Sequence, residues 1–181
     1  MTPIVQLPDP ILTKPAKTVT FFDKKLAAMI RDMKKMLLDA TNPKGVGLAG
    51  PQAGLPYRIF ITKPTEKKDI RVFINPEILS TSKEKTDGVP ERNNKLEGCL
   101  SIPNIWGSVH RHESLILSYQ DETGDAHTEK FTGFLATIIQ HETDHINGIL
   151  FTHRVMEQKG KFFQTGLDAN GKEILEELKL T

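Results

Sequence analysis

Apolar residues recur at helical spacing in two parts of the chain. The first part is residues 22–40, where lysines and aspartates occupy the opposite face and the apolar positions are Leu26, Met29, Ile30, Met33 and Leu37. The second part starts near Gly133 and stops at Asn147-Gly148, and its apolar face carries Phe134, Ile138, His141 and His145. The pattern predicts an amphipathic outer helix and a second helix whose apolar face also bears two histidines.

Runs rich in β-branched and aromatic residues predict two hairpins. One joins residues 57–62 to 71–79 through a charged turn, and the other joins 114–120 to 126–132 through Asp121-Glu122-Thr123-Gly124. These short antiparallel strands and the two helices together predict an α+β fold, with the strands packed around the histidine-bearing helix.

The other segments show no clear hydrophobic periodicity. Residues 80–95 are polar and include Asp87-Gly88 and Pro90, so we expect a long solvated loop or a flap there. Residues 174–178 fit either a short helix or an edge strand. At 181 residues and with no internal repeat, the chain is expected to form one domain, 1–181, with a variable tail from about residue 155.

Composition disfavours several classes of partner. The formal net charge of +1 gives no electrostatic argument for a nucleic acid or an anionic membrane. No stretch approaches the roughly 20 apolar residues of a membrane-spanning helix, and the first residues lack a signal-peptide pattern. We therefore expect a cytoplasmic protein. Its single cysteine, Cys99, cannot form an internal disulfide and is an inert buried residue, a reactive thiol or a metal ligand.

The sequence Gln140-His141-Glu142-Thr143-Asp144-His145 predicts a metal site on one helical turn. Residues i and i+4 share a face of a helix, so His141 and His145 can both reach one ion. Glu142 then lies where it could take a proton from water activated by that ion. The alternative, two histidines that only satisfy ordinary hydrogen bonds, is disfavoured by this spacing and by the glutamate between them.

A catalytic site of this kind usually has a third protein ligand. The extended zinc-protease pattern would place a histidine where Phe151 stands, so that form of metalloprotease is disfavoured. Downstream glutamates are available but have no distinctive context; they are Glu157, Glu173, Glu176 and Glu177. Cys99, within Glu97-Gly98-Cys99-Leu100-Ser101, would complete a Cys-His-His site with an open position for water.

Residues 45–52, Gly-Val-Gly-Leu-Ala-Gly-Pro-Gln, contain the G-x-G-x-x-G of a dinucleotide-binding loop. That fingerprint requires a strand before it and a helix after it, whereas here a helix is expected before it and Pro51 follows it. The glycines allow a ligand backbone to approach closely. Gln52 offers a neutral amide donor that could stabilise charge on a carbonyl oxygen. The alternative is a simple glycine turn.

Segments 45–52, 97–101 and 140–145 together resemble the three motifs of peptide deformylases, in the same order along the chain. The resemblance extends through Pro8-Asp9-Pro10, Asn75-Pro76 and Ser101-Ile102-Pro103, and it covers roughly residues 8–151. It implies the deformylase fold, in which short antiparallel sheets surround a central metal-bearing helix. The implied activity is removal of the formyl group from N-formylmethionyl nascent peptides.

The resemblance also implies roles for individual residues. The implied metal ligands are Cys99, His141 and His145. Glu142 is the implied acid and base, and the side chain of Gln52 with the backbone N–H of Leu100 would hold the oxyanion. One divalent metal ion is implied. Fe²⁺ is the metal that the resemblance favours, although a thiolate with two imidazoles also suits Zn²⁺, Ni²⁺ or Co²⁺.

For the substrate pocket we expect Val46 and Gly47 in the glycine motif, and Leu135 and Ile138, which precede the histidines on the helix. Trp106 stands where the family commonly has an arginine near the substrate. We expect its indole to supply an apolar wall for the substrate.

Smaller departures from the family pattern occur at Gly50, where alanine is usual, and at Thr143, where a large apolar residue is usual. Arg111 matches another family arginine and is expected to brace Glu97 or Asp144, or to be an ordinary exposed strand residue.

Two other functions remain open from the sequence: a zinc endopeptidase of the H-E-x-x-H type and a non-catalytic, metal-stabilised binding module. The family resemblance also implies an approach to the ribosome near the exit tunnel. The tail, residues 173–179, is mixed in charge and gives no independent support for such docking.

Overall fold

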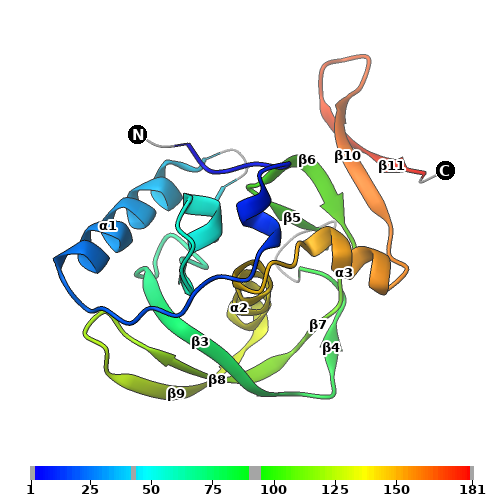
Figure 1. The fold of residues 1–181 in the computed structure, drawn as a ribbon. Coiled ribbons are helices and arrows are strands. Elements are labelled where there is room, and N and C mark those ends of the chain that lie inside the picture. Colours follow the sequence, from blue (N-terminus) through cyan, green and yellow to red (C-terminus); the bar gives the residue numbers. More distant parts are fainter. Residues whose placement is uncertain (1–2, 42–43, 90–94, 180–181) are drawn as a thin grey trace.

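The fold is known from a computed structural model that describes residues 3–41, 44–89 and 95–179. Strands surround a central helix, α2 (Gly133–Ile146) (Figure 1). The other helical elements are α1 (Lys24–Asp39), α3 (Phe151–Glu157) and the 3-10 turns η1 (Pro10–Thr13) and η2 (Gly50–Ala53). The α+β class predicted from the sequence is confirmed.

The described strands form three antiparallel sheets. The first has the order β1-β2-β3-β8-β9, with β1 (Gly47–Ala49), β2 (Ile59–Thr62), β3 (Arg71–Thr81), β8 (Ser114–Gln120) and β9 (Ala126–Thr132). The second has the order β11-β10-β6-β5, with β5 (Glu97–Cys99), β6 (Ile102–Gly107), β10 (Phe162–Leu167) and β11 (Glu173–Leu178). The third is the pair β4 (Lys85–Thr86) and β7 (Arg111–His112).

Helix α1 forms because its apolar residues share one face and its first turn is capped. The Asp23 carboxylate accepts hydrogen bonds from the backbone N–H groups of Lys25 and Leu26, at 2.9 and 3.2 Å. These donors have no partner within the helix itself. The buried face consists of Leu26, Ile30, Met33, Met36 and Leu37, and it packs on β1 and β2. The predicted outer helix is confirmed.

Both predicted hairpins are present. Strands β2 and β3 pair with Ile59 opposite Ile74, and β8 and β9 pair with Ser114 opposite Thr132. Pairing between β3 and β8 joins the two hairpins into one sheet. This pairing links distant segments, so no local pattern in the sequence reveals it.

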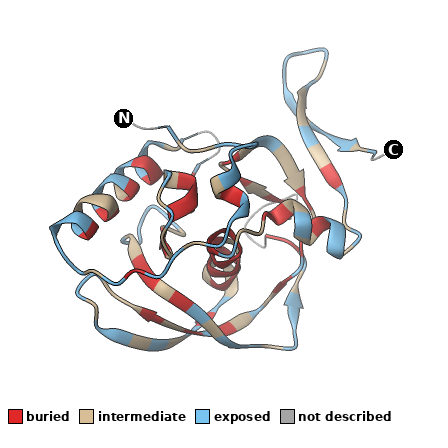
Figure 2. Ribbon diagram, in the orientation of Figure 1, coloured by how far each residue is buried: buried red, intermediate tan, exposed pale blue. Residues whose placement is uncertain are grey.

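Helix α2 is the most deeply placed helix of the molecule (Figure 2). Ten of its 14 residues are buried, and Ala136, Ile139 and Ile146 pack into the core formed with the first sheet. The helix ends at Asn147-Gly148 as predicted. Gly148 has φ 74°, and a Cβ there would lie 2.8 Å from the backbone oxygen of Thr13, so this position requires glycine.

The expectation of a long solvated loop or a flap over 80–95 is wrong in part. Strand β3 extends to Thr81, and Lys85–Thr86 forms β4 by pairing with Arg111–His112. The partner strand comes from a distant segment, so the local sequence reads as a loop. Residues 90–94, which include Pro90, lie outside the described part of the chain.

The C-terminal part of the chain is more regular than its sequence suggests. The segment around 174–178 is an edge strand, β11, and not a helix. It forms a hairpin with β10 that projects from the body of the molecule (Figure 1). None of the helices within the described ranges is long and apolar enough to span a membrane.

Candidate active site

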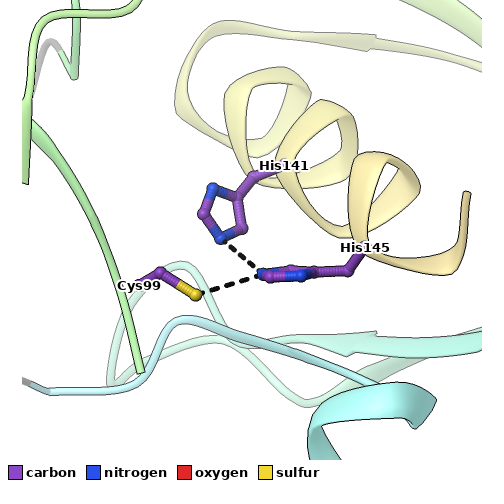
Figure 3. Close-up of side chains that lie close together, drawn as sticks. All are labelled: Cys99, His141 and His145. Carbon is purple, nitrogen blue, oxygen red and sulfur yellow. Dashed lines mark hydrogen bonds between the residues drawn. The ribbon is translucent and has the colours of Figure 1, made fainter. Parts of the chain in front are cut away.

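Cys99 from β5 and His141 and His145 from α2 point toward one another (Figure 3). The Cys99 Sγ lies 3.2 Å from Nε2 of His145, and the Nε2 atoms of the two histidines are 3.1 Å apart. All three potential ligand atoms lie within 4.8 Å of one another. With tetrahedral metal bonds of about 2.0 to 2.3 Å, ligand atoms lie roughly 3.3 to 3.6 Å apart. The group therefore needs only small shifts to hold one ion.

Glu97 sets the orientation of the His141 ring. Its Oε1 accepts a hydrogen bond of 2.6 Å from Nδ1 of His141, which leaves Nε2 directed at Cys99 and His145. Burial alone would lower the pKa of His141, but the Glu97 carboxylate outweighs it and holds that pKa well above its usual range. Burial and the neighbouring His141 hold the pKa of His145 well below its usual range, so its imidazole is neutral.

Arg111 links the site to the rest of the fold through buried ion pairs. Its guanidinium donates to Glu97 at 2.7 and 3.1 Å and to Asp144 Oδ2 at 2.6 Å. Burial alone would raise the pKa of Glu97, but Arg111 and His141 hold it well below its usual range. Arg154 from α3 donates to both Asp144 oxygens, at 2.6 and 3.1 Å. The expected bracing role of Arg111 is confirmed for both carboxylates, whereas Arg154 was missed.

The Glu142 carboxylate is buried beside the cluster. Its Oε2 has no hydrogen-bond partner among the residues that the structure describes, and burial raises its pKa to about 7. A Cβ on Gly47 would lie 2.2 Å from Glu142 Oε1 and 2.9 Å from Ile138 Cγ2. The glycine at position 47 therefore makes room for this carboxylate, which is suited to proton transfer near neutral pH.

Gln52 is fixed by the turn that carries it. Its Oε1 accepts a hydrogen bond of 2.9 Å from the Ala49 N–H, while its Nε2 points to Cys99 Sγ at 3.4 Å and to Ser101 Oγ at 3.3 Å. The side chain is 1% exposed. The amide of Gln52 and the backbone of Leu100, which follows Cys99 in the chain, thus both lie beside Cys99.

A cavity with about 590 Å³ of empty space, part of it open to solvent, lies in front of the cluster. Four of the five residues expected at the substrate line it, namely Val46, Gly47, Trp106 and Ile138, and Leu100, expected at the oxyanion, lines it too. Gln52 and Glu142 also contribute to its wall. The cavity therefore joins the converging ligand atoms to an apolar compartment.

The expectation for Leu135 is wrong. This side chain packs against the core cluster of the first sheet, whereas its neighbours Phe134 and Thr137 line the cavity. Successive residues of a helix point about 100° apart, so the face that holds Ile138 and His141 includes Phe134 and excludes Leu135. The helical periodicity of the sequence therefore indicates Phe134, and not Leu135, as a residue of the cavity. Val89 also lines the cavity, and its place in a polar segment gave no such signal.

A family model described as polypeptide deformylase matches residues 1–161. The chain belongs to the polypeptide deformylase family. A peptide deformylase of Christiangramia forsetii is 38% identical over 180 residues, covering 91% of this chain and 87% of that protein. Peptide deformylase 1 of Bacillus subtilis is 38% identical over 152 residues, covering 84% of this chain and 88% of that protein.

Solved deformylase structures share the fold. The peptide deformylase of Thermotoga maritima superposes with a TM-score of 0.76 at 35% identity, covering 86% of this chain and 97% of that one. The enzyme of Synechococcus elongatus, in complex with actinonin, gives 0.75 at 37% identity, covering 84% and 79%. Peptide deformylases are metal-dependent hydrolases that remove the N-formyl group from nascent polypeptides. A zinc endopeptidase and a non-catalytic binding module are not favoured.

Proposed function

We propose that this deformylase holds one divalent metal ion with Cys99, His141 and His145 and hydrolyses N-formylmethionyl peptides to formate and a free N-terminal amine. The observation that carries the proposal is the convergence of one thiol sulfur and two Nε2 atoms within 4.8 Å, beside a cavity that Cys99 and His141 line. Three ligand atoms that lie this close together are stabilised by a cation between them. Metal bound there supplies water with a pKa lowered toward about 7.

Glu142 moves the proton in this proposal. Its buried carboxylate takes a proton from the attacking water and gives it to the leaving amine nitrogen as the C–N bond of the formamide breaks. A pKa of about 7 makes both transfers accessible at neutral pH. The unpartnered Oε2 supports the role, because within the described chain that atom makes no hydrogen bond and can therefore meet a water molecule or the leaving amine.

Gln52 and Leu100 hold the negative charge that develops on the formyl oxygen. The Gln52 amide donates through Nε2, and its orientation is fixed in advance by the bond from Ala49. The backbone N–H of Leu100 is the second donor. Donors that are already in place when charge develops lower the barrier, and loss of one typically costs on the order of 100-fold or more in rate.

The methionine side chain occupies the apolar part of the cavity. Ile138 and Thr137, each 3% exposed, form its buried floor on α2. Val46 and Gly47 form the side nearest β1, and the Gly47 backbone can approach a peptide closely. An unbranched thioether suits an irregular apolar compartment of this kind.

We further propose that the native metal is Fe²⁺, with Zn²⁺, Ni²⁺ and Co²⁺ as functional substitutes. Elemental analysis of protein purified without oxygen identifies the bound metal. Reconstitution of chelated protein with each ion then ranks their activities. Predominance of zinc in fully active, anaerobically purified protein would overturn the iron proposal and leave the ligand set intact.

The substrates in the cell are formylated nascent chains, so the proposal includes a cytoplasmic location and an approach to the ribosome near the exit tunnel. Co-sedimentation of the intact chain with ribosomes, at low and moderate salt, tests the second part. Complete absence of the protein from the ribosome fraction under both conditions would show that it meets nascent chains in solution.

Formate release from formyl-Met-Ala-Ser is the direct test of the proposed function. The metal-loaded chain is expected to release one formate per peptide, and chelated protein is expected to be inactive until metal is restored. The peptide bonds should stay intact in the same reaction, as judged by mass spectrometry. Full metal loading without formate release would overturn the proposal.

A further inference from the structure

Trp106 connects the candidate active site to the C-terminal hairpin. In the second sheet it lies opposite Gly98 of β5 on one side and opposite Phe163 of β10 on the other. Strand β5 also carries Cys99, and β10 begins the hairpin that projects from the body of the molecule (Figure 1). The first strand of the hairpin thus pairs directly with β6, the strand that carries Trp106.

The two ends of the indole have different partners. A Cβ on Gly98 would lie 2.6 Å from both Cε3 and Cζ3 of Trp106, so the six-membered ring covers the Gly98 backbone. At the other end, Nε1 donates a hydrogen bond of 2.8 Å to Oγ1 of Thr165 on β10. Gly98 therefore fixes where the ring lies, and Thr165 fixes how it is turned.

The position of Trp106 in the cavity indicates which part of a substrate it meets. Trp106 lines the cavity and is partly exposed, whereas Thr137 and Ile138 are buried on its floor. If the methionine side chain fills the floor, the wall at the mouth faces the residue that follows it. An indole face there offers apolar contact to an aromatic or aliphatic side chain and no partner for a carboxylate.

We infer that Thr165 is a positioning residue for substrate selection. Its hydroxyl orients the Trp106 indole as an apolar wall, and the enzyme thereby prefers formylmethionyl peptides whose second residue is large and apolar. The C-terminal hairpin is then part of the substrate-binding apparatus. The inference rests on the proposed deformylase function.

The test is a pair of substitutions, Thr165→Val and Thr165→Ser, assayed on formyl-Met-Phe-Ser and formyl-Met-Gly-Ser. Valine keeps the shape of threonine and removes the hydroxyl, so kcat/KM for the phenylalanine peptide should fall about 2- to 10-fold, through KM. The glycine peptide should be unaffected, and serine should restore the preference. Thr128→Val, the same change on an exposed position of β9, is the matched control and should behave as the unaltered chain.

Tryptophan emission gives a second readout, because Trp106 is the only tryptophan of the chain. Thr165→Val should move the emission maximum to longer wavelength as the indole loses its fixed position, and Thr165→Ser should not. Equal loss of activity on both peptides, or an unchanged preference in Thr165→Val, would overturn the inference. Absence of formate release by the unaltered, metal-loaded chain would instead overturn the proposed function, and the two failures are thus distinct.

Discussion

Oε1 of Glu97 lies 2.6 Å from Nδ1 of His141, and the same carboxylate is held from behind by Arg111. The buried ion pair thus fixes the Glu97 carboxylate, and the carboxylate in turn fixes the His141 imidazole that faces Cys99. A carboxylate on the far nitrogen raises the basicity of a metal-binding imidazole and fixes its ring. The metal affinity of the proposed site should therefore depend on a residue that does not touch the metal.

Glu97→Gln is expected to weaken metal binding about 10- to 100-fold, because the amide can accept the His141 hydrogen bond but carries no charge. Competition with a chromophoric chelator measures the affinity. Glu129→Gln is the matched control, since Glu129 also forms an ion pair, with Arg71 at 2.8 Å, but lies on β9 and does not line the cavity. Equal affinity in Glu97→Gln and the unaltered chain would contradict the role of Glu97.

Glu142→Gln should abolish most of the turnover and leave the fold and the metal in place. The amide has nearly the same volume and can neither take nor deliver a proton, so kcat is expected to fall by about 10²- to 10⁴-fold. Formate release gives the rate, and elemental analysis with a thermal melt supplies the check on integrity. Retention of more than a tenth of the rate, with metal fully bound, would remove Glu142 from the proposed mechanism.

The sequence predicts those parts of the fold that local patterns specify. Helices α1 and α2 have long apolar faces, and the two hairpins have clear strand and turn composition. Helix α3 was missed because it has only seven residues, of which Phe151 and Val155 are buried, and this is too short for a periodic signal. Strands β4 and β10 pair with β7 and β6, which are distant in the sequence.

The same distinction applies to the site. The histidine pair is local, and Cys99 stands in a distinctive segment, so the three converging residues could be named before the structure. Arg154 could not be named in this way, because it reaches Asp144 from α3, the helix that the sequence does not predict. Thr165 is similar: its contact with Trp106 exists only once β10 pairs with β6.

Gly47→Ala should lower activity through Glu142. The added Cβ would meet Oε1 of Glu142 at 2.2 Å and Cγ2 of Ile138 at 2.9 Å, so the carboxylate or the helix must shift. Overpacking of this kind typically costs about 1 to 3 kcal/mol of stability, and we expect a lower melting temperature together with a kcat reduced at least 10-fold.

Gly166→Ala provides the comparison for that experiment. A Cβ at Gly166 would lie 3.3 Å from Cδ of Glu176, the flexible end of a side chain, which can move aside. This variant should keep the melting temperature of the unaltered chain and its turnover of formyl-Met-Ala-Ser, a peptide that lacks the large second residue for which the hairpin is inferred to select. If both alanine variants behave alike, the glycine at position 47 does not make room for Glu142.

Asp144→Asn should destabilise the fold more than its conservative chemistry suggests. Asp144 accepts hydrogen bonds from Arg111 at 2.6 Å and from Arg154 at 2.6 and 3.1 Å, and the Arg111 and Asp144 side chains are only 5% and 9% exposed. Removing one member of a buried ion pair leaves the other charge without compensation and typically costs about 3 to 5 kcal/mol. Urea unfolding of metal-free protein measures this loss without a contribution from bound metal.

Two further variants separate burial from charge. Asp69→Asn makes the same change on an exposed turn and should leave the free energy of unfolding within about 0.5 kcal/mol of the unaltered chain. Arg154→Gln removes the outer, 30% exposed partner and should cost less than Asp144→Asn, because water can solvate part of what remains. A loss as large for Arg154→Gln as for Asp144→Asn would mean that the outer pair, and not the buried Arg111 pair, stabilises the helix that carries the histidines.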